Sequence, residues 1–307
     1  MSTVEIGFAS GEAKAPAGAP PRDALRDLPG LREPPGLPET LARLGALELR
    51  FAVTKADIQA VQEMRYRVFF EDGGALADPL MRAGRRDDCP HDRVCDHLVV
   101  VDHDAVAPAG RRGSKVVGAY RVLRQDAIAS AGEFYAAGEF DIARLIARHP
   151  DKRFLELGRS CVLPAYRARR VLDLLWRGVW TYVRHHRIDV MFGCASLPGA
   201  DPREHADALA FLREHARAGE EWRTRALQQT AHSPAAGLDG GCTARRAVAS
   251  LPPLIKGYLR LGACFSDEVF VDRAFRTTDV LVVLPVANID ARYIEHFGGP
   301  AGHCAAA

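Results

Sequence analysis

Charged side chains interrupt segments of this sequence that are otherwise apolar. Glu156 and Arg159 lie within "FLELGRSCV", residues 154–162, which has the apolar content of a buried strand. Arg121 has apolar neighbours in an earlier strand-like segment, and Arg65 falls in the middle of the apolar stripe of an amphipathic helix. A buried charge without a partner is strongly destabilising. These residues therefore indicate either a polar cleft or a structural network of ion pairs.

The strand pattern alone would keep Glu156 and Arg159 apart. Strict alternation puts Glu156 on the same face as Gly158, and Arg159 on the opposite face with Cys161. Gly158 is a residue at which a β-bulge can form, and a bulge there would turn both charges toward one side of the sheet. Carboxylate and guanidinium groups facing one another would suit a cleft that handles protons and charged ligands.

Three arginines follow this strand directly. Arg167, Arg169 and Arg170 lie at the start of a helix that we expect over 168–185. The N-terminus of a helix attracts anions through its exposed N–H groups and its dipole, and the guanidinium groups add positive charge. The pattern favours a phosphate-carrying partner, and the alternative is a solvated helix cap.

The whole chain carries no comparable charge bias. Its 307 residues are 48% hydrophobic and 26% charged, and the formal net charge is +2, so overall electrostatics give no reason to expect a nucleic-acid partner. The seven cysteines are odd in number and scattered, which favours a reducing compartment. We find neither a signal-peptide pattern nor an apolar run near the roughly 20 residues of a membrane span. We therefore expect a cytoplasmic protein, at most peripheral to the inner membrane.

The elements that would position these residues form one domain. Residues 1–46, rich in Ala, Pro, Gly and Arg, predict a disordered extension, and 299–307 a flexible tail. Between them, strands and helices over 47–298 predict one α/β (α+β) domain. Thr54, with Asp57 three positions later, predicts a helix N-cap. We expect helices over 54–70, 168–185, 201–227 and 251–263, a loop over 228–250, and strands over 47–53, 96–102, 114–123, 154–162, 188–196 and 277–286.

One apparent metal set does not support a metal site. Cys89, His91, Cys95 and His97 gather in "DDCPHDRVCDHL". Their spacing matches no standard zinc pattern, and His97 begins a predicted strand. We expect no metal ion.

The charged residues and several longer segments resemble known families. The charged set resembles the acyl-homoserine-lactone synthases, which belong to the N-acetyltransferase (GNAT) superfamily. Over about residues 48–298 the chain is more similar to the bacterial ornithine N-acyltransferases, which make lyso-ornithine lipid from 3-hydroxyacyl-acyl-carrier protein. The segments that carry this similarity are "CDHLVVVD", "LLWRGVWTYVRHHRIDVMFGCASLPGADP", "LPPLIKGYLRLGA" and "TTDVLVVLPVANIDARYIEHFG". The charged set, with one aromatic residue, is Arg65, Phe69, Asp92, Arg121, Glu156 and Arg159.

The resemblance implies a fold and a donor. The fold is GNAT-like, a mixed central sheet flanked by helices, with a helical insertion and a C-terminal extension. Strand 154–162 would splay from its neighbour to admit a pantetheine arm, and Arg167, Arg169 and Arg170 would bind its phosphate. The superfamily's phosphate loop usually contains glycine, whereas this chain has Arg167-Ala-Arg-Arg-Val-Leu. This departure favours acyl-carrier protein over free acetyl-CoA, and no cofactor is expected besides the carrier's phosphopantetheine thioester as substrate.

The resemblance also implies roles in the aminolysis of that thioester. Glu156 would accept the proton of the attacking amine or orient it, and a backbone N–H near Cys161 or Val162 would stabilise the oxyanion. Asp92 would hold the acceptor's ammonium group or pair with Arg65. Phe69 would line the cleft wall or simply pack in the core. The arginines that would organise the cleft, one of them pairing with the amino acid's carboxylate, are Arg65, Arg121 and Arg159.

The leading expectation is therefore an N-acyltransferase that transfers a 3-hydroxyacyl group from acyl-carrier protein to the α-amine of ornithine. Its partners would be the carrier protein and the amino acid, with peripheral membrane contact as a further expectation. The alternatives are a signal synthase of the homoserine-lactone type and a non-catalytic module that binds a carrier protein or a membrane.

Overall fold

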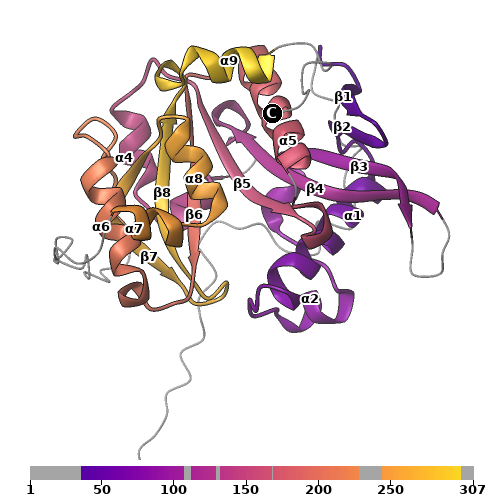
Figure 1. The fold of residues 1–307 in the computed structure, drawn as a ribbon, viewed down its shortest axis with the longest axis horizontal. Coiled ribbons are helices and arrows are strands. Elements are labelled where there is room, and N and C mark those ends of the chain that lie inside the picture. The colour runs from indigo at the N-terminus through magenta and orange to yellow at the C-terminus, as the bar shows by residue number, and fades with distance from the viewer. Residues whose placement is uncertain (1–35, 107–111, 129–131, 168, 228–243, 299–307) are drawn as a thin grey trace, which may run out of the picture.

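Eight strands form one mixed sheet in the order β1-β2-β3-β4-β5-β6-β8-β7 (Figure 1). Neighbouring strands are antiparallel except β5 and β6, which are parallel and joined by the crossover helix α5. The computed structural model describes residues 36–106, 112–128, 132–167, 169–227 and 244–298. The strands are β1 (Thr40–Leu44), β2 (Leu47–Phe51), β3 (Asp96–Val106), β4 (Arg112–Arg124), β5 (Phe154–Val162), β6 (Val190–Pro198), β7 (Cys264–Asp272) and β8 (Thr277–Pro285).

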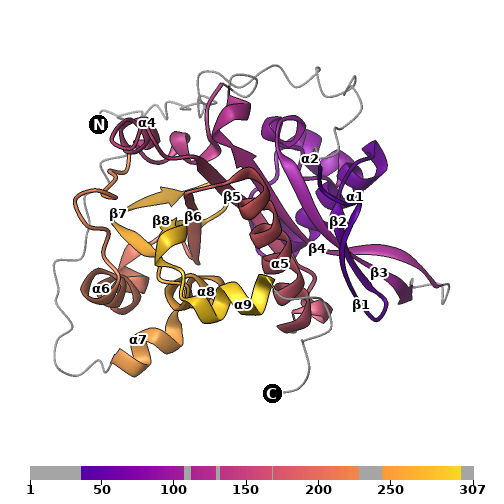
Figure 2. The same ribbon diagram turned by 90° about the horizontal axis from the view of Figure 1, so that it is seen from above.

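Helices cover both faces of this sheet. Helix α1 packs against one face, while α5 lies across the other with α9 beside it (Figure 2). The described helices contain no stretch long and apolar enough to cross a membrane. The α-helices are α1 (Lys55–Tyr66), α2 (Pro79–Gly84), α4 (Ile142–Ala147), α5 (Arg169–His186), α6 (Ala206–His215), α7 (Ala244–Ser250), α8 (Pro253–Arg260) and α9 (Ala291–Gly298), and short 3₁₀ turns span Pro90–Arg93, Gln125–Ala127, Tyr135–Gly138, Pro164–Tyr166, Pro202–His205 and Val286–Asn288.

Local capping fixes where α1 begins, as the sequence predicts. The Thr54 hydroxyl accepts a hydrogen bond from the Asp57 N–H (3.1 Å), and the Asp57 carboxylate accepts one from the Thr54 N–H (3.1 Å). The Arg50 guanidinium, on β2, donates to Asp57 at 2.6 Å and ties this end of the helix to the sheet. At its other end α1 continues as a π-helix, η2 (Arg67–Glu71). This wider turn carries Phe69 toward the β7–β8 end of the molecule, where it meets Phe275.

The structure corrects the predicted extension and loop. Thr40–Leu44 lie inside the segment predicted to be disordered, yet they form the edge strand β1 because they pair with β2. Residues 228–250 were expected as a loop, and their last seven residues form α7 instead. The predictions for residues 1–35, for 228–243 and for the tail 299–307 concern residues outside the described part of the chain.

Two further elements differ because distant segments pair. The helix predicted to reach residue 227 ends at His215. After it, Phe265 donates a backbone hydrogen bond to Ala216 (2.8 Å) and accepts one from Ala218 (2.8 Å). Phe265 also belongs to β7, which pairs with β8 and which the sequence did not predict.

The sheet opens between its two parallel strands. Pairing of β5 with β6 covers only Phe154–Glu156 against Val190–Phe192. A side chain at Gly193 would overlap the carbonyl oxygen of Leu157, so glycine is required at the last point of close approach. Beyond it, β5 has no ladder partner on the β6 side among the described residues. Unpaired backbone groups of β5 therefore face this gap.

A bulge distorts β5 on its other side. The register of β4 and β5 shifts between Ala119 and Arg121, and Arg159 adopts a left-handed conformation with φ of 49°. The bulge predicted near Gly158 is present, and the residue with the unusual backbone is Arg159 itself.

Candidate active site

Arg65 is the centre of a buried ion-pair network. Its Nε lies 2.9 Å from Oδ2 of Asp87, and its two terminal nitrogens lie 2.9 and 2.5 Å from the two oxygens of Asp92. All three side chains are buried. Burial would raise the pKa of Asp92, but the Arg65 guanidinium holds it well below its usual range. Asp92 thus takes the second of its two expected roles, pairing with Arg65.

Asp87 is a member of this network that the sequence analysis missed. Besides Arg65, its carboxylate meets Arg159, whose Nε lies 3.2 Å from Oδ2. Asp87 stands in the polar run "RRDDCP", where nothing marks it as buried. One signal could have found it, because several arginines predicted to be buried need more negative charge than the single carboxylate of Asp92 supplies.

Arg121 and Arg159 flank one aromatic side chain, Tyr135. The guanidinium carbon of Arg121 lies 5.4 Å from the Tyr135 ring centroid, and that of Arg159 lies 4.7 Å from it. On its other side Arg159 lies 4.4 Å from the ring of Phe275, in the β7–β8 turn. The side chain of Arg159 is 12% exposed, against 3% for Arg121 and 1% for Arg65. Arg159 is therefore the most accessible of the three arginines.

Glu156 organises the segment that carries Tyr135. Its carboxylate accepts hydrogen bonds from the backbone N–H groups of Tyr135 (2.9 Å) and Ala136 (2.6 Å). Burial raises the pKa of Glu156, while the Ala136 N–H and the charge of Arg121 oppose that shift. The backbone N–H of Tyr135 thus donates to Glu156, and its ring packs against the guanidinium group of Arg159. Both charges face one side of the sheet, as a bulge requires.

The other predicted site residues lie along β5 and after it. Cys161 and Val162 are buried at the end of β5, beyond the point where β6 departs. Arg167 is exposed and donates to the carbonyl of Val162 at 3.3 Å. Arg170 is exposed in the first turn of α5. Arg169 begins α5, and its side chain lies outside the described residues.

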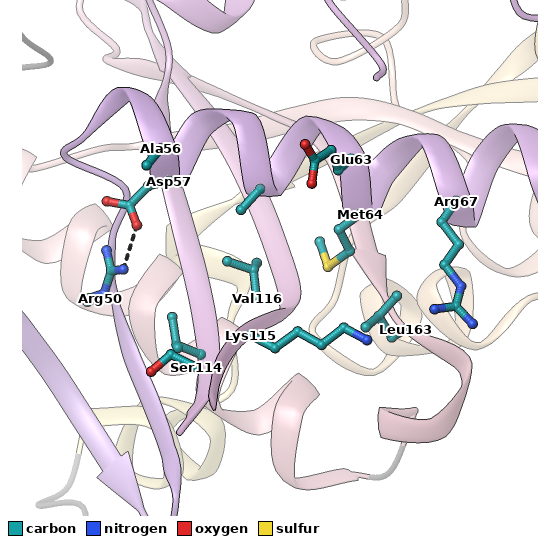
Figure 3. A pocket seen from close by; sticks show the side chains of 12 residues that line it. Arg50, Ala56, Asp57, Glu63, Met64, Arg67, Ser114, Lys115, Val116 and Leu163 are labelled. Carbon is teal, nitrogen blue, oxygen red and sulfur yellow. Dashed lines mark hydrogen bonds and ion pairs between the residues drawn. The ribbon is translucent and has the colours of Figure 1, made fainter. Parts of the chain in front are cut away.

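A cavity of about 440 Å³ opens between α1 and the ends of the central strands (Figure 3). Leu163, the residue directly after β5, lines it. In Figure 3 the Lys115 side chain extends toward Leu163, with Arg67 close by. Both cationic side chains are exposed. The cavity thus adjoins the end of β5 at which the sequence analysis expects the carrier's phosphate, and Lys115, Arg67 and the exposed Glu63 all line it.

Fold and site together define an acyltransferase of the GNAT class. The mixed sheet opens beside a bulged strand, and a helix begins where that strand ends. Residues 64–177 match the family model described as an Acetyltransferase (GNAT) domain. This range contains every site residue that the sequence analysis selected.

Comparison with known proteins identifies the particular family. The chain is 47% identical to the L-ornithine N(alpha)-acyltransferase of Rhizobium meliloti (strain 1021), over 86% of this chain and 88% of that protein. It is 49% identical to the L-ornithine N(alpha)-acyltransferase of Agrobacterium fabrum (strain C58 / ATCC 33970), over 84% of this chain and 87% of that protein. The chain belongs to the L-ornithine N(alpha)-acyltransferase family. Among solved structures, the N-acyl amino acid synthase FeeM from uncultured soil microbes aligns with a TM-score of 0.45 and 11% identity, over 78% of this chain and 91% of that one.

Proposed function

We propose that this protein transfers a 3-hydroxyacyl group from the thioester of acyl-carrier protein to the α-amine of L-ornithine, which gives lyso-ornithine lipid. The observation that carries the proposal is the gap beside β5, open beyond Glu156 and bordered by the accessible cation of Arg159. Family membership supports the acceptor, because the relatives are named for L-ornithine.

Exposed cations support a carrier-protein donor. Arg167 and Arg170 lie at the end of β5 and the start of α5, where a phosphopantetheine phosphate would meet the helix N-terminus. Lys115 and Arg67 add two exposed cations at the cavity, where Glu63 is the exposed anion (Figure 3). Acyl-carrier protein is acidic, so this surface complements it.

The reaction is aminolysis of a thioester. The neutral α-amine attacks the acyl carbon, the C–S bond breaks, and the carrier thiol leaves with the proton that the amine loses. We assign Glu156 to receive or direct that proton, since each of its oxygens keeps a lone pair besides the backbone bond that it accepts. A β5 N–H near Cys161 or Val162 would stabilise the oxyanion.

The carboxylate of the acceptor would bind Arg159. Arg65 is surrounded by Asp87 and Asp92, and Arg121 is bound by Asp92 and by the Cys89 sulfur (3.0 Å). Arg159 alone of the three combines a partly exposed side chain with a place on the edge of the gap. An arginine there can hold a carboxylate through two parallel hydrogen bonds.

Mass spectrometry with purified components tests the proposal. The protein, a 3-hydroxyacyl-acyl-carrier protein and L-ornithine should yield N-(3-hydroxyacyl)ornithine, and Arg159→Gln should raise the KM for ornithine at least about tenfold. Arg203→Gln is the matched control, because Arg203 is 83% exposed. A lactone product, or no transfer by the folded wild-type protein, would refute the proposed function.

A further inference from the structure

Three carboxylates from separate segments converge beside Tyr135. Glu139 follows the 3₁₀ turn that begins at Tyr135, Asp272 ends β7, and Asp279 lies in β8. One carboxylate oxygen from each residue lies within 4.8 Å of the other two. Glu139 is 5% exposed and Asp279 is 3% exposed. We call these three residues the acidic cluster.

Two oxygens of the acidic cluster lack a partner. Within the described residues, neither Oε2 of Glu139 nor Oδ1 of Asp279 has a hydrogen bond. A buried acceptor left in this state is destabilising. Burial raises the pKa of Glu139 well above its ordinary value and that of Asp279 to about 6, and the neighbouring carboxylates add to both shifts. The Cys194 thiol beside Glu139 and the Ser196 and Thr277 hydroxyls beside Asp279 oppose these shifts, as does Arg159. The unpartnered oxygens therefore point to a positively charged ligand.

The cluster adjoins the candidate active site. Asp279 pairs in the sheet with Ser196, on the part of β6 that has separated from β5. Glu139 belongs to the segment that Glu156 holds through its first two N–H groups. Tyr135 in that same segment stacks against Arg159. The guanidinium group of Arg159 and the carboxylate of Glu139 thus both lie at the segment 135–139.

The geometry suits an ammonium group. Three acceptors that each lie about 2.8 Å from one nitrogen, in tetrahedral directions, are separated by about 4.6 Å. The oxygens of the acidic cluster lie within 4.8 Å of one another, a range that admits this separation. Calcium, by contrast, takes six to eight oxygen ligands, whereas the side chain that hydrogen-bonds Glu139 here is the thiol of Cys194.

We propose that Glu139, Asp272 and Asp279 bind the side-chain ammonium group of the amino acid acceptor, and so select a diamino acid over an aliphatic one. This inference rests on the proposed function. Arg159 would hold the α-carboxylate, and the carboxylates of the cluster would hold the far end of the same molecule. The α-amine between these two ends would then be directed toward the gap in the sheet.

The test compares L-ornithine with L-norvaline, which has the same carbon chain without the terminal amine. With 3-hydroxyacyl-acyl-carrier protein as donor, the wild-type protein should favour ornithine in kcat/KM by about tenfold to a hundredfold. Glu139→Gln and Asp279→Asn should each lower that ratio about tenfold, whatever happens to the absolute rates. Asp151→Asn is the matched control, since its side chain is 73% exposed and it removes the same charge.

A third variant protects the test against misfolding. Asp272 accepts the N–H groups of Ala274 (2.8 Å) and Phe275 (2.9 Å) through Oδ1. Asparagine keeps this oxygen, so Asp272→Asn removes the charge and preserves the turn. If Asp279→Asn does not fold, the ornithine-to-norvaline ratio of kcat/KM measured for Asp272→Asn tests the proposal in its place.

Each outcome separates the two proposals. An unchanged ornithine-to-norvaline ratio in folded variants overturns the inference and leaves the proposed function standing, as does a wild-type ratio near one. A stoichiometric divalent cation in the purified wild-type protein that Asp279→Asn loses, measured by elemental analysis, reassigns the cluster to a metal. Acylation of neither amino acid by the wild-type protein refutes both proposals.

Discussion

Glu156→Gln should damage both the stability and the chemistry of this protein, and the two effects can be measured separately. The Glu156 carboxylate accepts two backbone N–H groups, from Tyr135 and Ala136. Glutamine offers one acceptor oxygen and one NH₂ donor, so one buried N–H loses its partner. That loss costs about 1–3 kcal/mol of the free energy of unfolding, or about 2–12 °C in Tm for a domain of this size.

The chemical effect should be larger than the stability effect. If Glu156 receives or directs the amine proton, its removal should lower kcat about 10²–10⁴-fold. Thermal unfolding gives the first quantity, and single-turnover acylation of ornithine, measured well below the variant's Tm, gives the second. Thr40→Val provides a control in which a hydrogen bond to a different carboxylate, that of Glu48, is lost.

The pH profile distinguishes a proton acceptor from a positioning residue. A proton acceptor makes kcat rise with pH through the pKa of Glu156, and this rise should vanish in Glu156→Gln. A residue that only positions the Tyr135 segment should lower kcat equally at every pH. Near-normal turnover by folded Glu156→Gln would remove Glu156 from the mechanism altogether.

Three further predictions concern the network, the gap and the acidic cluster. Asp92→Asn leaves the buried arginines with one carboxylate fewer, so it should lower the free energy of unfolding by about 3–5 kcal/mol and Tm by about 6–20 °C. Asp151→Asn is the exposed control. An unchanged Tm would contradict the role of the network. Gly193→Ala forces a Cβ onto the Leu157 carbonyl and should lower the free energy of unfolding by about 1–3 kcal/mol. Gly219→Ala places its Cβ in open space and should leave thermal unfolding unchanged. Equal effects of the two variants would argue against a tight contact between Gly193 and Leu157. Asp279 has a pKa raised to about 6, so the native state holds more protons than the unfolded state between about pH 4 and 6, and the free energy of unfolding should fall as pH rises through that window. The groups that face Asp279 are Glu139, Asp272, Arg159, Ser196 and Thr277; Asp279→Asn should flatten this slope in urea titrations at several pH values, and an unaltered slope would assign it to other groups.

The sequence predicted the elements whose signals are local. The Thr54–Asp57 capping box starts α1 in the sequence and in the structure alike, because both partners lie within one turn. Strand β7 escaped prediction because polar residues interrupt it and its register shifts between Phe265 and Val269. Its pairing with β8 is long-range, and no short window of sequence contains it.

The same contrast applies to the site. Arg65, Arg121 and Arg159 were found because a charge amid apolar neighbours is conspicuous in a sequence. Asp87 was missed because it lies in a polar stretch, and Asp279 because it stands at the polar start of the apolar strand 277–286; each is buried by segments distant in the sequence. The cations of the cleft, with Asp92 and Glu156, could therefore be found from the sequence, whereas Asp87 and the acidic cluster could not.

Buried charges that face opposite charges and buried charges that face like charges differ in their capacity for a ligand in this protein. Arg65, Asp87 and Asp92 are buried together and bonded to one another, so they have little capacity for a substrate, and they hold α1 against the segments that precede and include β5. Glu139 and Asp279 are also buried, but they face one another and Asp272 instead of a bonded arginine, an arrangement that is stable only if a proton or a cation joins them. Because a bound diamine would supply that cation, the same acceptor that the enzyme acylates should also stabilise it, and L-ornithine should raise Tm more than L-norvaline does at equal concentration. Equal shifts by the two amino acids would show that the buried carboxylates are neutral and take no part in selecting the acceptor.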